Sequence, residues 1–257
     1  MKFIVTGGEG FIGRALTAYL LSRENEVISV DRKNGLEAGE YFSSSDLSEV
    51  DCVFHLAAQT SVFNQNKGDI IRDNIETFKT VCDACKRHGV KLIYASSSTA
   101  NHENTRSLYG ISKQFNEQYA RCYNPDATGV RFHNVYGPNP RHGTLLWYML
   151  HQERVRLFNE GKNIRHFTYI DDIVKGLLMT YELNLSSVVN IANPEVTSTL
   201  QLAEIVSKYK HLEIELIAEK REFDCKEQIV NEAVYTLPLH YTPIEDGIRC
   251  IFANKPV

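Results

Sequence analysis

Three glycines spaced three residues apart stand near the start of this chain, in the stretch FIVTGGEGFIG. A short apolar run precedes them, and the apolar residues of the following segment, IGRALTAYLLSREN, recur at helical spacing. Gly7, Gly10 and Gly13 therefore predict a tight turn between a buried strand and a helix, where a side chain would hold the backbone away from a ligand. The N–H groups of such a turn and the positive end of the helix favour a pyrophosphate.

Strand-like and helix-like segments alternate along the first half of the chain. The strand candidates are rich in apolar residues, as expected for strands buried on both faces. This alternation predicts an α/β fold, a Rossmann-type doubly wound parallel sheet covered by helices on both sides. The expected strands are KFIV, EVISVD, SEVDCVFHLAA, KLIYASSS and TGVRFHNVYG, and the two helices between the later strands are 74–88 and LYGISKQFNEQYARCYN.

The regular alternation of strand-like and helix-like segments ends near residue 138, where the loop GPNPRHG begins. TLLWYMLHQ and STLQLAEIVSKYK read as helices, RHFTYIDDIVKGLLMTYE as a short strand leading into a helix, and SVVNIAN as a further strand. We expect residues 1–137 to form a nucleotide-binding core that receives a later strand and helix from about 165–195. Residues 138–257 then form a small C-terminal α/β substrate lobe that is not an independent domain.

Composition excludes several classes of protein. The net charge of −4 argues against a nucleic-acid partner. No apolar run approaches the roughly 18 residues of a membrane span, and the apolar start is too short for a signal peptide. We therefore expect a cytoplasmic protein with no membrane partner.

Cys82 and Cys85 form a C-x-x-C pair, which redox and zinc proteins also use. No second cysteine or histidine pair stands nearby at the spacing of metal ligands, and both residues fall on the apolar face of helix 74–88. We interpret them as core residues and expect no metal; His133, His142 and His166 also lack metal-like spacing.

Asp31 ends the second expected strand, 18 residues after Gly13. A carboxylate near this offset accepts the adenosine ribose hydroxyls of NAD and repels the extra phosphate of NADP. Arg32 follows directly and could soften that repulsion, so the sequence indicates NAD as the cofactor while leaving some room for NADP.

Several further motifs resemble one family along nearly the whole chain. These are TGGEGFIG, SDL, HLAAQTSV, YGISK, RFHNVYGP and RHFTYIDDIVKG, although His166 stands where an aspartate is usual. They resemble the extended short-chain dehydrogenase/reductases, in the branch of NAD-dependent nucleotide-sugar epimerases and dehydratases similar to UDP-glucose and UDP-glucuronate 4-epimerases. The cofactor-binding residues that this resemblance implies are Gly7, Gly10, Phe11, Ile12, Gly13, Asp31, Arg32, Asp46, Leu47, Leu56, Ala57, Ala58, Asn74, Tyr109 and Lys113.

Tyr109 and Lys113 stand four residues apart on an expected helix, so both side chains project from one face. A tyrosine with a pKa near ~10 is a weak base at neutral pH, and a nearby ammonium is expected to lower that pKa. The resemblance implies that Ser97, after the strand KLIYASSS, bridges Tyr109 and a sugar hydroxyl, with Ser98 as the alternative. Ser97, Tyr109 and Lys113 are thus the expected catalytic residues.

The residues after Ser97 favour one reaction. In the resembling family, a 4,6-dehydratase carries an Asp-Glu pair at the positions of Ser98 and Thr99, and Glu103 fits that pattern poorly. Hydroxyl groups cannot replace a carboxylic acid, whereas inversion at C4 through a transient 4-ketose needs none. The sequence therefore favours an isomerase, an NAD-dependent epimerase of a nucleoside-diphosphate sugar, preferably UDP-linked.

Two alternatives stay open at this stage. An NAD(P)-dependent nucleotide-sugar reductase or dehydrogenase would release its reduced cofactor in each turnover. A regulator that senses the dinucleotide without catalysis would need no intact catalytic set.

The resemblance also implies the substrate contacts and the assembly. Asn134, Arg165 and Arg221 are expected to hold the diphosphate, since arginine pairs phosphate oxygens bidentately. Gln59, Thr60 and Ser61 are expected to contact the sugar or the cofactor. The apolar faces of helices 74–88 and 109–123 imply a homodimer through a four-helix bundle. The chain is shorter than most members in the segment between Asp31 and Asp46, before Asn74 and in the C-terminal lobe.

Overall fold

Six parallel strands form the central sheet of the computed structural model, which describes residues 1–64, 66–101, 107–222 and 224–253. Glu103 lies outside these ranges. The strand order is β10-β5-β4-β3-β1-β2. The strands span β1 Lys2–Thr6, β2 Glu26–Val30, β3 Cys52–His55, β4 Lys91–Ser97, β5 Thr128–Phe132 and β10 Val188–Ile191.

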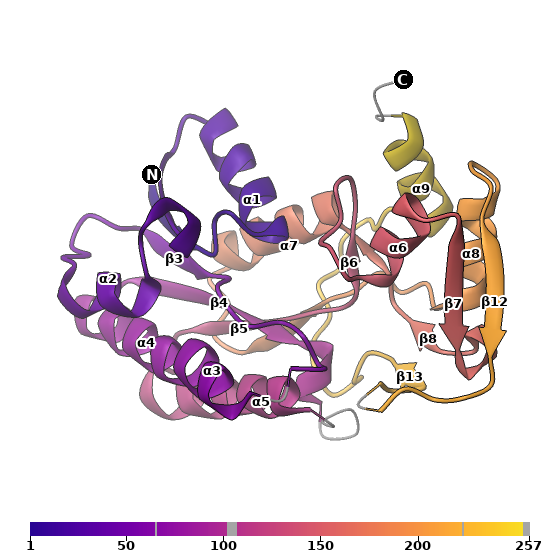
Figure 1. Ribbon diagram of the computed structural model, residues 1–257. Helices are drawn as coiled ribbons and strands as arrows, with labels where there is room; N and C mark the ends of the chain where they lie inside the picture. Colours follow the sequence, from indigo (N-terminus) through magenta and orange to yellow (C-terminus); the bar gives the residue numbers. More distant parts are fainter. Residues whose placement is uncertain (65, 102–106, 223, 254–257) are drawn as a thin grey trace.

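Helices cover both faces of this sheet (Figure 1). On one face lie α1 and α7, and on the other lie α2, α4 and α5. Short helix α3 and a π-helical turn lead directly into α4. Their bounds are α1 Phe11–Ser22, α2 Ala38–Ser44, α3 Lys67–Ile70, the π-helical turn Ile71–Glu76, α4 Thr77–His88, α5 Leu108–Tyr123 and α7 Ile170–Glu182.

The side chains of β1 show why the strands are apolar throughout. Ile4 packs into the core layer under α2 and α4, whereas Phe3 and Val5 pack into the layer under α1 and α7. Successive residues of a strand point to opposite faces, so a sheet with helices on both sides buries all of them. The predicted α/β fold with a doubly wound parallel sheet is confirmed.

The order of the strands creates a switch point beside β1. The chain runs from β1 outward to β2, then returns and crosses to β3 on the other side of β1. The loops after β1 and β3 therefore diverge, and in open α/β sheets ligands bind in the crevice that such loops leave.

The second half of the chain builds a smaller group of elements beside the sheet (Figure 1). Met149, Val206 and Ile248 lie at the centre of its apolar core. β10 leaves this group and joins the main sheet beside β5. The elements are β6 Val135–Tyr136, α6 Leu145–His151, β7 Arg154–Phe158, β8 Ile164–Arg165, β9 Thr168–Tyr169, β11 Thr197–Ser198, α8 Thr199–Ser207, β12 Glu213–Ile217, β13 Glu227–Gln228 and α9 Ile244–Ala253.

Cys82 and Cys85 lie fully buried on the inner face of α4, and neither forms a disulfide. Their interpretation as core residues is confirmed. Within the part of the chain that the structure describes, no helix has the length and apolar character needed to cross a membrane.

Candidate active site

A cavity of about 690 Å³ opens at the carboxyl ends of the central strands and extends to the C-terminal elements. The structure brings most of the predicted site residues to its wall. They are Gly7, Gly10, Phe11, Ile12, Gly13, Asp31, Arg32, Leu56, Ala57, Ala58, Gln59, Ser97, Tyr109, Lys113, Asn134, Arg165 and Arg221. Three other residues of the cofactor prediction, Asp46, Leu47 and Asn74, are not part of this wall.

The turn after β1 leaves no room for a side chain at Gly7 or Gly13. Gly7 has a φ of +67°, and a Cβ there would lie 2.8 Å from the backbone nitrogen of Ala57. A Cβ on Gly13 would lie 2.1 Å from the carbonyl oxygen of Gly7. At the start of α1, Gly10 provides no side-chain cap, so the first N–H groups of the helix are left for a ligand. This cradle fits a pyrophosphate.

Asp31 directly follows β2 and organises the next turn. Its carboxylate accepts hydrogen bonds from the backbone nitrogens of Glu9, at 3.1 Å, and Lys33, at 3.0 Å. It also lines the cavity beside the glycine turn, as expected for a residue that meets the adenosine ribose. Arg32 lines the cavity too, but its guanidinium is bound to the carboxylates of Asp73 and Glu37.

Asn74 supports the site from beneath. Its side chain accepts a hydrogen bond from the Gln59 nitrogen at 2.7 Å and donates to the Gln59 carbonyl oxygen at 2.9 Å. It also donates to the Ser112 hydroxyl at 3.0 Å. Asn74 is 1% exposed, and its side chain fixes the loop after β3. Its contact with the cofactor stays a prediction.

Asp46 and Leu47 do not line the cavity, and their contact with the cofactor stays a prediction. Leu47 is fully buried in the core under α2 and α4, and the exposed Asp46 carboxylate accepts hydrogen bonds from the nitrogen and hydroxyl of Ser48. The short segment between Asp31 and Asp46 contains α2, and Leu36, Glu37 and Ala38 of this segment line the cavity.

Ser97, Tyr109 and Lys113 converge from β4 and α5. Ser107 caps the start of α5 by accepting a hydrogen bond from the Gly110 nitrogen, which fixes the first turn that carries Tyr109. Ser97 is hydrogen-bonded to Tyr109. The Lys113 ammonium lies 5.9 Å from the centre of the Tyr109 ring and donates to the Ala95 carbonyl oxygen at 2.8 Å.

The burial of these groups shifts their pKa values. Burial lowers the pKa of Lys113 to about 8, opposed by the nearby Glu117 carboxylate. Burial also raises the pKa of Tyr109 above its usual value, and the Ser97 hydrogen bond and the charge of Arg141 only partly offset this. The expected net lowering of the Tyr109 pKa is therefore wrong for the chain by itself, because desolvation of the phenolate outweighs its neighbours.

A buried ion pair that the sequence analysis missed stands behind this set. Glu117, one helical turn after Lys113, accepts hydrogen bonds from Arg131 at 2.7 and 2.8 Å and from the Ser96 hydroxyl. Its spacing of four residues from Lys113 places Glu117 on the same helix face, which the sequence does show. That Glu117 pairs with Arg131 on β5 depends on the arrangement of the sheet. The pair ties α5 to β4 and β5 beneath the cavity.

The far end of the cavity carries the predicted substrate cations. Arg165 is buried and donates to the Asp224 carboxylate at 2.7 Å and to the Cys225 carbonyl oxygen at 2.6 Å. Arg221 stacks on the Phe63 ring, 4.2 Å from its centre. Asn134 adopts a positive φ of 31° and donates to the Gln228 side chain at 3.1 Å.

Arg141 is a further cation that sequence reasoning missed. It lies in the loop after β6, lines the cavity and donates a hydrogen bond to the Thr60 hydroxyl. Its charge acts on Tyr109, which places it on the catalytic side of the cavity.

A parallel sheet with a glycine turn after β1, an acidic residue after β2 and a Ser-Tyr-Lys set at the cavity defines a dinucleotide-binding α/β enzyme of the short-chain dehydrogenase/reductase type. Residues 3–192 match the family described as the NAD dependent epimerase/dehydratase family. This chain belongs to that family.

Individual proteins agree with this assignment. Protein CapI of Staphylococcus aureus is 31% identical over 232 residues, covering 69% of this chain and 68% of that protein. UDP-glucuronate 4-epimerase 2 of Arabidopsis thaliana is 29% identical over 232 residues, covering 69% of this chain but 54% of the plant protein, so the chain spans about half of that relative. The solved structure of TunA, an NAD-dependent NDP-hexosamine 5,6-dehydratase, superposes with a TM-score of 0.83 at 26% identity, covering 98% of this chain and 96% of that one.

Proposed function

We propose that this protein is an NAD-dependent epimerase of a nucleoside-diphosphate sugar, and specifically that it inverts C4 of a UDP-sugar through a transient 4-ketose. One observation carries the proposal. Ser97, Tyr109 and Lys113 line the same cavity as the glycine turn. A group that can accept the proton of a sugar hydroxyl and a turn that can bind a dinucleotide therefore share one cavity. The family match and the 4-epimerase named among the relatives support the same reaction.

The chain's own groups manage the proton. In our proposal the Tyr109 oxygen takes the proton of the sugar C4 hydroxyl, and the Ser97 hydroxyl bridges the two groups. The Lys113 ammonium, held by the Ala95 carbonyl oxygen, stabilises the phenolate and holds ribose hydroxyls of the cofactor. NAD would supply, when bound, a reversible acceptor for the C4 hydride. The same tyrosine returns the proton after the ketose has turned.

The residues around Ser97 favour epimerisation over dehydration. Ser98 and Thr99 are buried beside the cavity, and neither side chain can act as a carboxylic general acid. This distinction matters because one structural relative is a dehydratase.

The proposal also covers the residues that bind the substrate diphosphate, the oligomeric state and the cellular localisation. Asn134, Arg165 and Arg221 would hold the diphosphate, and residues 138–257 would form a small substrate-binding lobe that is not an independent domain. A homodimer through a four-helix bundle of α4 and α5 is supported by exposed apolar side chains, among them Ile111 and Phe115. Cytoplasmic localisation stays a prediction from the sequence.

Turnover without added cofactor tests the proposal. A thermal-shift screen against UDP-, GDP-, CDP- and dTDP-sugars identifies the substrate class, since a ligand of the folded state raises the melting temperature. The purified protein with its resident NAD should then convert that sugar to its epimer up to equilibrium with no NAD added. Absolute dependence on added NAD(P)H, with one equivalent consumed per product, would instead support a reductase or dehydrogenase.

A further inference from the structure

The guanidinium of Arg32 stands where many dinucleotide enzymes decide between NAD and NADP. Arg32 follows Asp31 at the end of β2 and lines the cavity. A free arginine at this place pairs the 2′-phosphate of NADP bidentately and offsets the repulsion from the preceding carboxylate. Whether the Arg32 guanidinium is free or already paired therefore affects which of the two cofactors the chain binds.

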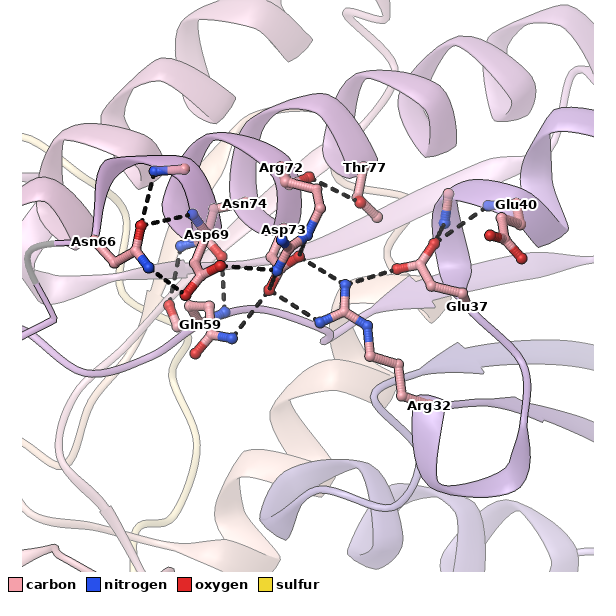
Figure 2. A network of polar contacts seen from close by, with 12 residues as sticks. Arg32, Glu37, Glu40, Gln59, Asn66, Asp69, Arg72, Asp73, Asn74 and Thr77 are labelled. Carbon is pink, nitrogen blue, oxygen red and sulfur yellow. Dashed lines mark hydrogen bonds and ion pairs between the residues drawn. The ribbon is translucent and has the colours of Figure 1, made fainter.

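Two carboxylates, one of them 41 residues further along the chain, already hold Arg32 (Figure 2). Its guanidinium donates to both oxygens of Asp73, at 3.0 and 2.6 Å, and to Glu37 at 3.0 Å. Asp73 belongs to the π-helical turn before α4, and Glu37 precedes α2. We call these three residues the Arg32 clamp.

The backbone of Arg32 is also fixed. Residues Arg32–Asn34 form a 3-10 turn, whose start is capped when the Asp31 side chain accepts from Lys33 and the Asn34 side chain accepts from the Asp31 nitrogen. Both ends of the side chain are thus determined, one by the turn and one by the carboxylates.

Releasing Arg32 from the clamp has an electrostatic cost. Asp73 is 6% exposed, and its other donors are the Arg72 guanidinium and the Gln59 amide. Burial alone would raise the pKa of the Asp73 carboxyl, but the hydrogen bonds from Arg32, Arg72 and Gln59 outweigh it and hold that pKa well below its usual range, so the carboxyl is ionised at neutral pH. Moving Arg32 away would leave this buried charge with fewer partners.

The surrounding charge adds to the effect. Asp31, Glu37 and Asp73 all line the cavity together with Arg32, whereas Arg72, the other cation paired with Asp73, does not line it. A 2′-phosphate would bring further negative charge into that group, whereas a ribose hydroxyl brings none.

We infer that the Arg32 clamp makes this cavity selective for NAD over NADP, because Asp73 and Glu37 deny Arg32 to a 2′-phosphate. Asp73 is then a positioning residue that acts through Arg32. The inference rests on the proposed function only in that the cavity binds a dinucleotide.

Binding measurements on the purified full-length protein, freed of resident cofactor, test the inference. Isothermal titration calorimetry with NAD⁺ and NADP⁺ gives the ratio of the two dissociation constants for each variant. Because both constants are measured on the same preparation, the ratio can also be compared for a variant of reduced stability. The wild type should bind NAD⁺ at least tenfold more tightly than NADP⁺. Asp73→Asn should reduce that ratio about tenfold or more by improving NADP⁺ binding, and Glu37→Gln should reduce it about threefold.

Two controls separate the clamp from a general loss of charge. Asp69→Asn removes a carboxylate that pairs with Arg72 at 3.1 Å on the same helical segment, and its ratio should match the wild type. Adding Arg32→Ala to Asp73→Asn should abolish the gain in NADP⁺ affinity, since the released guanidinium is then missing.

Unchanged ratios in both Asp73→Asn and Glu37→Gln, with NAD⁺ still bound, would overturn the inference while leaving the proposed function intact. A gain in Asp73→Asn that persists without Arg32 would also overturn it. Failure of the wild type to bind either dinucleotide would overturn the proposed function and the inference with it.

Discussion

Replacing Tyr109 by phenylalanine should lower the turnover number for epimerisation by about 10²–10⁴-fold while leaving the fold and NAD⁺ affinity nearly unchanged. The substitution removes only the phenolic oxygen, which the account makes the acceptor and donor of the C4 hydroxyl proton. The Tyr109 ring is largely buried at the cavity, so phenylalanine keeps its packing. Steady-state kinetics and NAD⁺ titration of the same preparation measure both effects.

Tyr123→Phe is the matched control, because Tyr123 ends the same helix but is 61% exposed and lies away from the cavity wall. It should retain wild-type turnover. Activity of Tyr109→Phe within a few-fold of the wild type would remove the tyrosine from the mechanism. A biological role unaffected by Tyr109→Phe, with cofactor still bound, would favour the non-catalytic regulator.

Replacing Gly13 by alanine should weaken NAD⁺ binding by at least 100-fold and abolish turnover. The new Cβ would lie 2.1 Å from the Gly7 carbonyl oxygen and 2.8 Å from the Gly8 Cα, and both contacts are with backbone that must move. The start of α1 would then shift from the turn, and overpacking of this kind destabilises a fold by about 1–3 kcal/mol. Thermal unfolding and NAD⁺ titration measure the two consequences.

Gly68→Ala provides the comparison for that variant. Gly68 lies in α3, and a Cβ there would meet only the Asn66 side chain, at 3.4 Å. Its NAD⁺ affinity should stay within a few-fold of the wild type. If Gly13→Ala bound NAD⁺ as tightly as Gly68→Ala does, the glycine turn would not be the pyrophosphate cradle.

The features that sequence predicts best here are local ones. The glycine turn is formed by residues close together in the sequence whose backbone geometry requires glycine. The sheet that is covered on both faces is indicated by strands that are apolar throughout. Tyr109 and Lys113 were recognisable because their spacing places them on one helix face and their context follows the nucleotide turn. Short strands such as β7 and β12 escaped prediction because their alternation spans only five residues each.

The features that escaped depend on pairing across the fold. Asp73 gives no sign in the sequence of holding Arg32, 41 residues earlier. Likewise, Asp224 meets Arg165 only because β13 pairs with β8. The hydrogen bonds that join the Asn74 amide to the backbone of Gln59 also depend on the fold. The direction of the Tyr109 pKa shift depends on how deeply the ring is buried, which spacing alone does not reveal.

The fate of the C4 hydrogen tests the central claim most directly. The nucleoside-diphosphate sugar identified by the screen would be deuterated at C4 and converted in ordinary water, and its epimer analysed by mass spectrometry and NMR. The account predicts that the product keeps the full deuterium content at C4, since the hydride leaves and returns without meeting solvent. Deuterium lost from C4 to the water would contradict an epimerase that works by reversible oxidation at that carbon.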